Sequence, residues 1–140
     1  MSRHARVWLA VPMIVGLAFV TASCGDDEGG VSATLADFSI TLDSDSAPAG
    51  EVTFDVTNDA QQTHEFVVFQ TDLAEDQLPT DDEGLVDEEG EGLTLIDEIE
   101  DMAGGSSQSL TVNLDAGNYV LICNLPGHYQ QGMHTSFSAS

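Results

Sequence analysis

Three side chains near the C-terminus could bind a metal ion together. Cys123, His128 and Met133 follow one another at the spacing C-x4-H-x4-M. Pro126 and Gly127 predict a turn between the first two, so one loop would present all three side chains. A thiolate, an imidazole and a thioether form a soft to intermediate donor set, which suits copper in either oxidation state.

A fourth donor lies earlier in the chain. His64 stands at the start of an apolar run, just after the polar residues 58–63, and the topology of a β-sandwich could bring it beside the C-terminal loop. One cysteine and two histidines in a plane, with a weak axial methionine, are the donor set of a blue-copper site. We therefore predict one copper ion bound by His64, Cys123, His128 and Met133.

Each candidate ligand also has an ordinary structural explanation. A single histidine is more often a surface residue than a ligand, and a buried methionine or cysteine usually serves only packing. The combination argues against these explanations, because an unpaired thiol is a liability in an oxidising compartment. His134 follows Met133 on an expected strand and should point the opposite way, so we do not predict it to be a ligand.

The N-terminal sequence predicts export. Arg3 and Arg6 precede an apolar run, residues 7–20, and small residues follow it. This run is shorter than the roughly 20 apolar residues that a transmembrane helix needs. We interpret residues 1–23 as a signal peptide and expect the mature protein on the outer face of the cytoplasmic membrane or in the periplasm.

The residue after the predicted signal peptide is a cysteine, Cys24. This arrangement resembles a bacterial lipobox, although Thr21 stands where an aliphatic residue is usual. We interpret Cys24 as a lipid attachment site and the polar, Gly-rich residues 24–30 as a flexible tether. The alternative is an ordinary cleaved signal in which this cysteine is incidental.

The charge of the chain excludes one class of partner. Arg3 and Arg6 are the two basic residues, whereas the 25 Asp and Glu residues all lie at Asp26 or later. Nucleic acid is therefore not expected as a partner, because binding to phosphates depends on cationic side chains. The acidic mature chain would attract a cationic protein. A second explanation is that the carboxylates keep the protein soluble, and both explanations can hold together.

Short apolar segments predict the strands that would carry the ligands. Apolar and polar residues alternate in three segments, which predicts strands with one buried face: 35–42, 52–56 and 110–114. Residues 64–69 and 119–123 are almost wholly apolar, which predicts strands covered on both faces. With a last strand at residues 133–137, the pattern favours one β-sandwich domain over residues 31–140.

Residues 71–105 interrupt this pattern. The segment is rich in Asp and Glu and shows no strand periodicity before LTLIDEIE, residues 93–100, where the apolar spacing fits a short helix and, almost as well, a short strand. We predict an acidic inserted loop that contains a short helix. No stretch has the ligand spacing of a calcium-binding loop, so we interpret the acids as a solvated or partner-facing surface.

The loop CNLPGHYQQGM resembles the metal-binding loop of the cupredoxins, the small blue copper proteins. Its spacing is most similar to that of the rusticyanins, sulfocyanins and auracyanins, and the resemblance extends over residues 31–140 except the acidic insertion. It implies a Greek-key β-sandwich, one type 1 copper and one-electron transfer. Several cupredoxins brace their ligand loops with Asn or Ser beside the first histidine, and Glu65 occupies that place here.

The resemblance also implies a route for electrons. The ring edge of His128 would lie near the surface in an apolar patch that includes Leu125 and Pro126. The partner would be a cationic redox protein such as a cytochrome, or a membrane complex of a respiratory or photosynthetic chain, because an acidic protein is attracted to basic surfaces.

Two other functions fit these residues less well. A multicopper enzyme needs further copper sites built mostly from histidine, and the mature chain has only His64, His128 and His134. A copper carrier or storage protein would bind Cu(I) through exposed methionine and histidine, whereas a thiolate in a constrained loop favours electron transfer. We therefore expect a monomeric electron carrier that is not an enzyme, with the copper carrier as the alternative.

Overall fold

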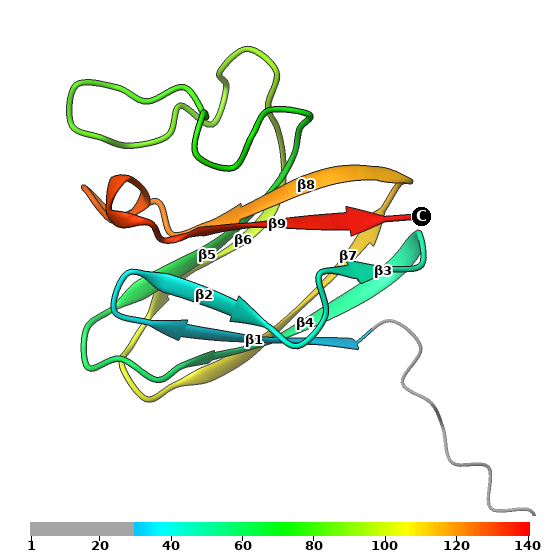
Figure 1. Cartoon of the computed structure of the whole chain (residues 1–140). Coiled ribbons are helices and arrows are strands. Elements are labelled where there is room, and N and C mark those ends of the chain that lie inside the picture. The colour runs from blue at the N-terminus through cyan, green and yellow to red at the C-terminus, as the bar shows by residue number, and fades with distance from the viewer. Residues whose placement is uncertain (1–29) are drawn as a thin grey trace, which may run out of the picture.

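Nine strands form two sheets in the computed structural model, which describes residues 30–140 (Figure 1). Sheet A has the order β2-β1-β4-β7 and contains β1 (Gly30–Ala36), β2 (Ser39–Leu42), β4 (Gly50–Asn58) and β7 (Ser107–Leu114). Sheet B has the order β3-β9-β8-β5-β6 and contains β3 (Ser46–Ala47), β5 (His64–Gln70), β6 (Thr94–Met102), β8 (Gly117–Ile122) and β9 (His134–Ala139).

The two sheets pack face to face, which confirms the predicted all-β Greek-key sandwich. Most neighbouring strands are antiparallel, but β1 runs parallel to β4 and β3 runs parallel to β9. The predicted signal peptide and most of the predicted tether, including Cys24, lie outside the described residues. No helix within residues 30–140 is long and apolar enough to span a membrane.

An inner cluster of apolar side chains fills the space between the sheets. It contains the inward-facing residues of β4, Val52, Phe54 and Val56, which are at most 1% exposed. The Phe54 ring packs edge-on against Phe137, with ring centroids 5.3 Å apart, and at a tilt against Phe66, 5.4 Å away. Alternation of apolar and polar residues along β4 therefore produces one buried and one exposed face, as the sequence predicts.

The prediction of a short helix in the insertion is wrong. Residues 94–102 form β6, which pairs with β5 at the edge of sheet B. The pairing shifts register twice, between His64 and Phe66 and between Val68 and Phe69. Such irregularities interrupt the period of two, so Leu95, Ile96 and Ile99 acquire a helix-like spacing within a strand. A short 3₁₀ helix, η1 (Tyr129–Gln131), lies instead in the C-terminal loop.

The remaining insertion, residues 71–93, is the acidic segment, and it covers the outer face of sheet B (Figure 1). In Figure 1 its loops lie above β8 and beside the loop that carries η1. A second, outer cluster of apolar side chains joins segment and sheet. It consists of Val67, Phe69, Leu78, Val86, Val120, Ile122 and Tyr129. Both faces of β5 and β8 are therefore buried, as their nearly continuous apolar sequences predict.

Candidate metal centre

The side chains of His64, Cys123 and His128 meet at one end of the sandwich. The two Nδ1 atoms are 3.2 Å apart, and Cys123 Sγ lies 3.4 Å from His128 Nδ1 and 3.7 Å from His64 Nδ1. Among residues 30–140, these three form the one group of His, Cys, Asp and Glu side chains that could hold a metal ion. The sequence prediction and the structure therefore agree on the same three residues.

The shape of this group fits a trigonal metal site. Three atoms at these separations have a common centre about 2 Å from each of them, close to ordinary metal–nitrogen bonds of about 2.0–2.1 Å and slightly less than metal–sulfur bonds of about 2.3 Å. One sulfur and two imidazole nitrogens are the planar donors of a blue-copper site. The residues present therefore fit copper.

Strand pairing brings these ligands together from distant parts of the sequence. His64 is the first residue of β5, and Cys123 directly follows the last residue of β8. The two strands are antiparallel neighbours with Val67 opposite Ile122, so the start of β5 lies beside the end of β8. His64 and Cys123 are fully buried there.

The other ligands come from the ligand loop, residues 123–133. Backbone hydrogen bonds fold this loop back on itself, because the Cys123 N–H donates to the Met133 carbonyl and the Met133 N–H donates to the His128 carbonyl, each at 3.1 Å. Gly127 and Gly132 have φ angles of 78° and 104°, which glycine adopts without strain. Met133 is fully buried in the inner cluster, and these backbone bonds place it beside Cys123 and His128, so it is the residue that would supply the thioether donor.

Burial sets the protonation states of the metal-free site. It lowers the pKa of His64, helped by the neighbouring His128, and it lowers the pKa of His128, so both imidazoles are neutral at pH 7 and keep a lone pair for a metal. Burial raises the pKa of the Cys123 thiol, while the Glu65 N–H, 3.3 Å from Sγ, opposes this effect. Metal binding must therefore displace a proton from sulfur.

Asn58, which our sequence prediction did not include, fixes the loop that precedes His64 to β6. Its amide nitrogen donates to the carbonyls of Gln62 and Met102, at 2.9 and 2.8 Å, and its side-chain oxygen accepts from the Ala60 N–H at 3.0 Å. Asn58 is fully buried and follows Val52, Phe54 and Val56 in the inward phase of β4. An asparagine at a position of β4 that faces the core is the feature of the sequence that points to a buried hydrogen-bonding role.

The surface beside His128 contains the predicted patch and one further aromatic residue. Pro126 is exposed and Leu125 is half-buried. Phe38, at the turn between β1 and β2, packs edge-on against the His128 ring with centroids 5.3 Å apart. Its φ of 59° lies in the left-handed region, which is unusual for an aromatic residue. No local pattern distinguishes Phe38 in the sequence.

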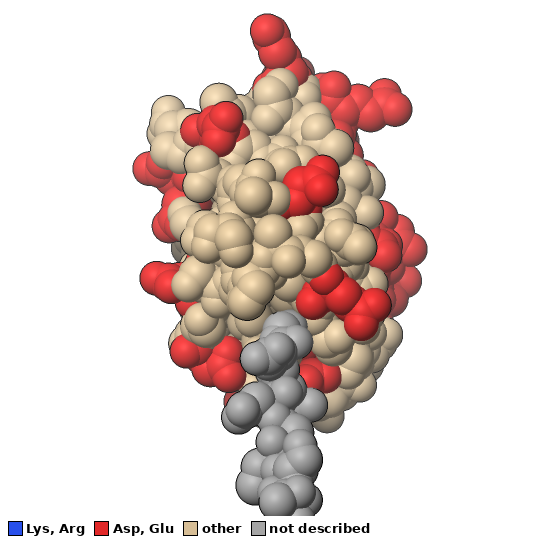
Figure 2. All heavy atoms as spheres, turned by 90° about the vertical axis from the view of Figure 1, so that its right-hand side faces the viewer, with Lys and Arg blue, Asp and Glu red and all other residues tan. Residues whose placement is uncertain are grey.

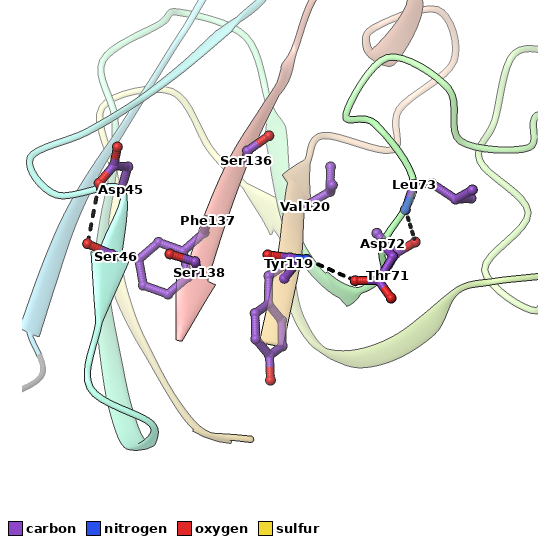
Figure 3. Close-up of a pocket in the computed structure, with 11 residues that line it drawn as sticks. Asp45, Ser46, Thr71, Asp72, Leu73, Tyr119, Val120, Ser136, Phe137 and Ser138 are labelled. Carbon is purple, nitrogen blue, oxygen red and sulfur yellow. Dashed lines mark hydrogen bonds between the residues drawn. The ribbon is translucent and has the colours of Figure 1, made fainter. Parts of the chain in front are cut away.

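Two other features lie outside the metal centre. His134 packs against the Tyr129 ring, 5.2 Å away, and its Nδ1 lies 3.5 Å from a carboxylate oxygen of Glu75. A groove of about 340 Å³ crosses β8 and β9 near Thr71 and Asp72 (Figure 3). Its lining has carboxylates, hydroxyls and an amide but no histidine or cysteine, so it offers no soft metal donor.

Comparisons with known proteins agree with this geometry. The family model of the sulfocyanin (SoxE) domain matches residues 39–140. No curated protein sequence matches the chain.

Among solved structures, the chain is similar to auracyanin B, with 21% identity and a TM-score of 0.59 over 80% of this chain and 88% of that one. It is also similar to auracyanin from Roseiflexus castenholzii, with 19% identity and a TM-score of 0.56 over 79% and 96% of the two chains. Rusticyanin from Thiobacillus ferrooxidans gives 19% identity and a TM-score of 0.55 over 79% and 76%. The chain therefore belongs to the sulfocyanin family of blue copper proteins, with His64, Cys123, His128 and Met133 arranged as a type 1 copper site.

Proposed function

We propose that this protein carries single electrons between redox partners outside the cytoplasmic membrane, with its copper alternating between Cu(I) and Cu(II). The observation that carries the proposal is the closeness of the three donor atoms, which lie 3.2 to 3.7 Å apart. Bound copper supplies the one-electron redox change. The chain supplies donors that are already in place, so little needs to move when an electron arrives.

Burial explains why the donors stay in place. His64, Cys123 and Met133 are fully buried, and the last two belong to the inner cluster. His128 is partly exposed beside Phe38 and Pro126, which favours it as the edge through which electrons pass. We propose no catalytic role, because the whole chain contains four histidines and cannot supply the further copper sites of a multicopper enzyme.

The partner that we propose is a cationic redox protein such as a cytochrome, or a membrane complex with a basic docking surface. Residues 30–140 contain no Lys or Arg. Acidic side chains lie at the end of the sandwich that is opposite the ligand loop (Figure 2), and others lie along the acidic segment, so the negative charge is not confined to one end. The sequence of residues 1–24 supports export and attachment to a membrane through lipid on Cys24.

A visible absorption spectrum of the Cu(II)-loaded protein tests the centre. We expect an intense blue thiolate-to-copper band that disappears in Cys123→Ser and persists in His134→Gln, the matched control at a histidine outside the ligand set. The band should bleach with ascorbate and return with a one-electron oxidant. A colourless wild-type copper complex would contradict thiolate ligation.

Repeated redox cycles beside a Cu(I) chelator separate an electron carrier from a copper carrier. An electron carrier keeps its copper through the cycles, so the blue band should recover its full intensity. A copper carrier releases the metal after reduction, so the band would decline with each cycle.

The salt dependence of the reaction with a cationic cytochrome tests the proposed partner. Reduction of the protein by such a cytochrome should slow as salt rises, and a rate independent of salt would contradict a basic partner.

A further inference from the structure

The acidic segment contacts the ligand loop through two side chains that are neighbours of metal ligands in sequence. Asn124 follows Cys123, and Tyr129 follows His128. Both side chains make hydrogen bonds to the backbone of the acidic segment, and Tyr129 also belongs to the outer cluster. The loop is therefore fixed from the outer face of sheet B as well as from the inner cluster.

Tyr129 uses both hydrogen-bonding functions of its hydroxyl. The oxygen accepts from the Leu78 N–H and donates to the Glu75 carbonyl, each at 2.9 Å. The side chain is 5% exposed, and its ring packs in the outer cluster with Leu78 and Val86. Removing the hydroxyl would leave a buried N–H and a carbonyl of the acidic segment without this partner.

Asn124 pairs with Val86 as a neighbouring strand would. Its side-chain oxygen accepts from the Val86 N–H at 2.7 Å, and its amide nitrogen donates to the Val86 carbonyl at 3.1 Å and to the Glu88 carboxylate at 3.0 Å. Close packing adds a third connection between the loop and the acidic segment. The side chain of Gln130 lies so close to Gly84 that a Cβ atom at Gly84 would clash with it.

The 3₁₀ helix within the ligand loop, η1, has little stability of its own. It is a single turn, and its N-cap residue His128 makes no side-chain capping bond. Short helices of this kind depend on tertiary contacts. The contacts available on the outer side are those of Tyr129, Asn124 and Gln130 with the acidic segment.

We propose that Tyr129 and Asn124 are positioning residues, through which the acidic segment braces the ligand loop and holds His128 and Cys123 in their metal-binding places. The segment thus has a role in the copper centre that is separate from its charge. This inference rests on the copper site and not on electron transfer, so a failure of the proposed function would leave it standing.

Tyr129→Phe tests the brace, and Tyr119→Phe is the matched control. Tyr119 is also a buried tyrosine of this domain, 1% exposed, whose hydroxyl donates to the Asp115 carbonyl at 2.7 Å. It lies near the start of β8, far along the strand from Cys123. Figure 3 shows its ring leaving β8 on the side opposite Val120, toward the inner cluster.

Both variants lose one buried hydroxyl, so we expect both to lower the melting temperature of the metal-free protein. Only Tyr129→Phe should release copper to a chelator faster, by about tenfold, and change the copper hyperfine splitting in the electron paramagnetic resonance spectrum. Amide hydrogen exchange of residues 124–132 in the metal-free protein should also accelerate only in this variant. Equal copper release and equal spectra in the two variants would overturn the proposal.

Asn124→Ser keeps the test decisive if Tyr129→Phe does not fold. We expect it to accelerate copper release in the same direction, because serine is too short to pair with both polar groups of Val86. In the double variant the two effects should be less than additive, since both side chains hold the same segment. Copper release at the wild-type rate in Asn124→Ser would contradict the brace.

Discussion

The inner cluster between the sheets and the outer cluster beneath the acidic segment bury opposite faces of sheet B. The inner cluster is larger and draws on both sheets, whereas the outer cluster joins sheet B to the few apolar residues of a charged segment. Cys123 and Met133 belong to the inner cluster, and Tyr129 belongs to the outer one. The inner cluster therefore contributes most of the apolar core, and the ligand loop places buried side chains in both clusters.

Alternation along β8 explains how one strand serves both clusters. Leu121 and Cys123 face the inner cluster, while Val120 and Ile122 face the outer cluster. The ligand loop begins where this strand ends, so it continues between the two clusters. We therefore expect damage to the inner cluster to unfold the domain, and damage to the outer cluster mainly to loosen the copper site.

Phe54→Ala should have the largest effect on stability. The side chain is fully buried between Phe66 and Phe137, and truncating such a phenylalanine costs about 3–5 kcal/mol. Urea unfolding of the metal-free variant measures this loss. A loss below about 1 kcal/mol would mean that the inner cluster does not dominate the stability of the fold.

Asn58→Ala should be the next most damaging change. It removes three hydrogen bonds at the copper end of the inner cluster, and the groups of Gln62, Met102 and Ala60 lose their partner. We expect a loss of roughly 2–3 kcal/mol and weaker copper binding, because Asn58 orders the loop that precedes His64. Urea unfolding and copper titration measure the two effects, and unchanged copper affinity would restrict Asn58 to a role in stability.

Leu78→Ala should separate the two clusters most clearly. It removes an apolar side chain of the outer cluster but keeps the backbone N–H that donates to Tyr129. We expect a loss of about 2 kcal/mol, at the lower end for buried leucines, because the acidic segment can collapse onto the gap. Copper release should accelerate although the sandwich remains folded. A stability loss as large as that of Phe54→Ala would contradict the division between the clusters.

The sequence was sufficient to predict the apolar face of β4 and the four residues that the structure arranges as a type 1 copper site, for different reasons. Val52, Phe54 and Val56 repeat with the period of a strand, and the ligands combine rare residue types at a short spacing. The outer cluster was predicted only in part. The apolar runs of β5 and β8 indicate strands covered on both faces, but Leu78 and Val86 belong to no periodic pattern, so the sequence does not show which segment covers sheet B.

Tyr129 and β6 were missed for the same physical reason. The partners of Tyr129 are about fifty residues away in sequence, and no local pattern records them. The spacing of apolar residues in β6 reflects bulges in its pairing with β5, which are a property of two strands and not of one.

Glu98→Gln should produce the smallest effect and tests how charge acts on the outer side of the molecule. Burial, followed by repulsion from Glu88, Glu100 and Asp97, raises the pKa of Glu98 above its ordinary value of 4.5. The folded protein therefore binds this proton more tightly than the unfolded chain does. Ionised Glu98 accordingly lowers the free energy of unfolding at pH 7, and this penalty disappears as the pH falls below about 4.5.

Replacement by glutamine should raise the free energy of unfolding of the metal-free protein at pH 7 by less than about 1 kcal/mol, because Glu98 is partly exposed and solvent screens its repulsion. The gain should shrink with added salt and vanish below about pH 4.5. His64 and His128 titrate in both proteins, so their effect cancels in the difference.

Glu51→Gln removes the same charge from an exposed position on β4 and is the control. If this control raises the free energy of unfolding as much as Glu98→Gln does, the lower net charge alone explains the gain in stability. Repulsion between the carboxylates of β6 and the acidic segment would then not be its cause.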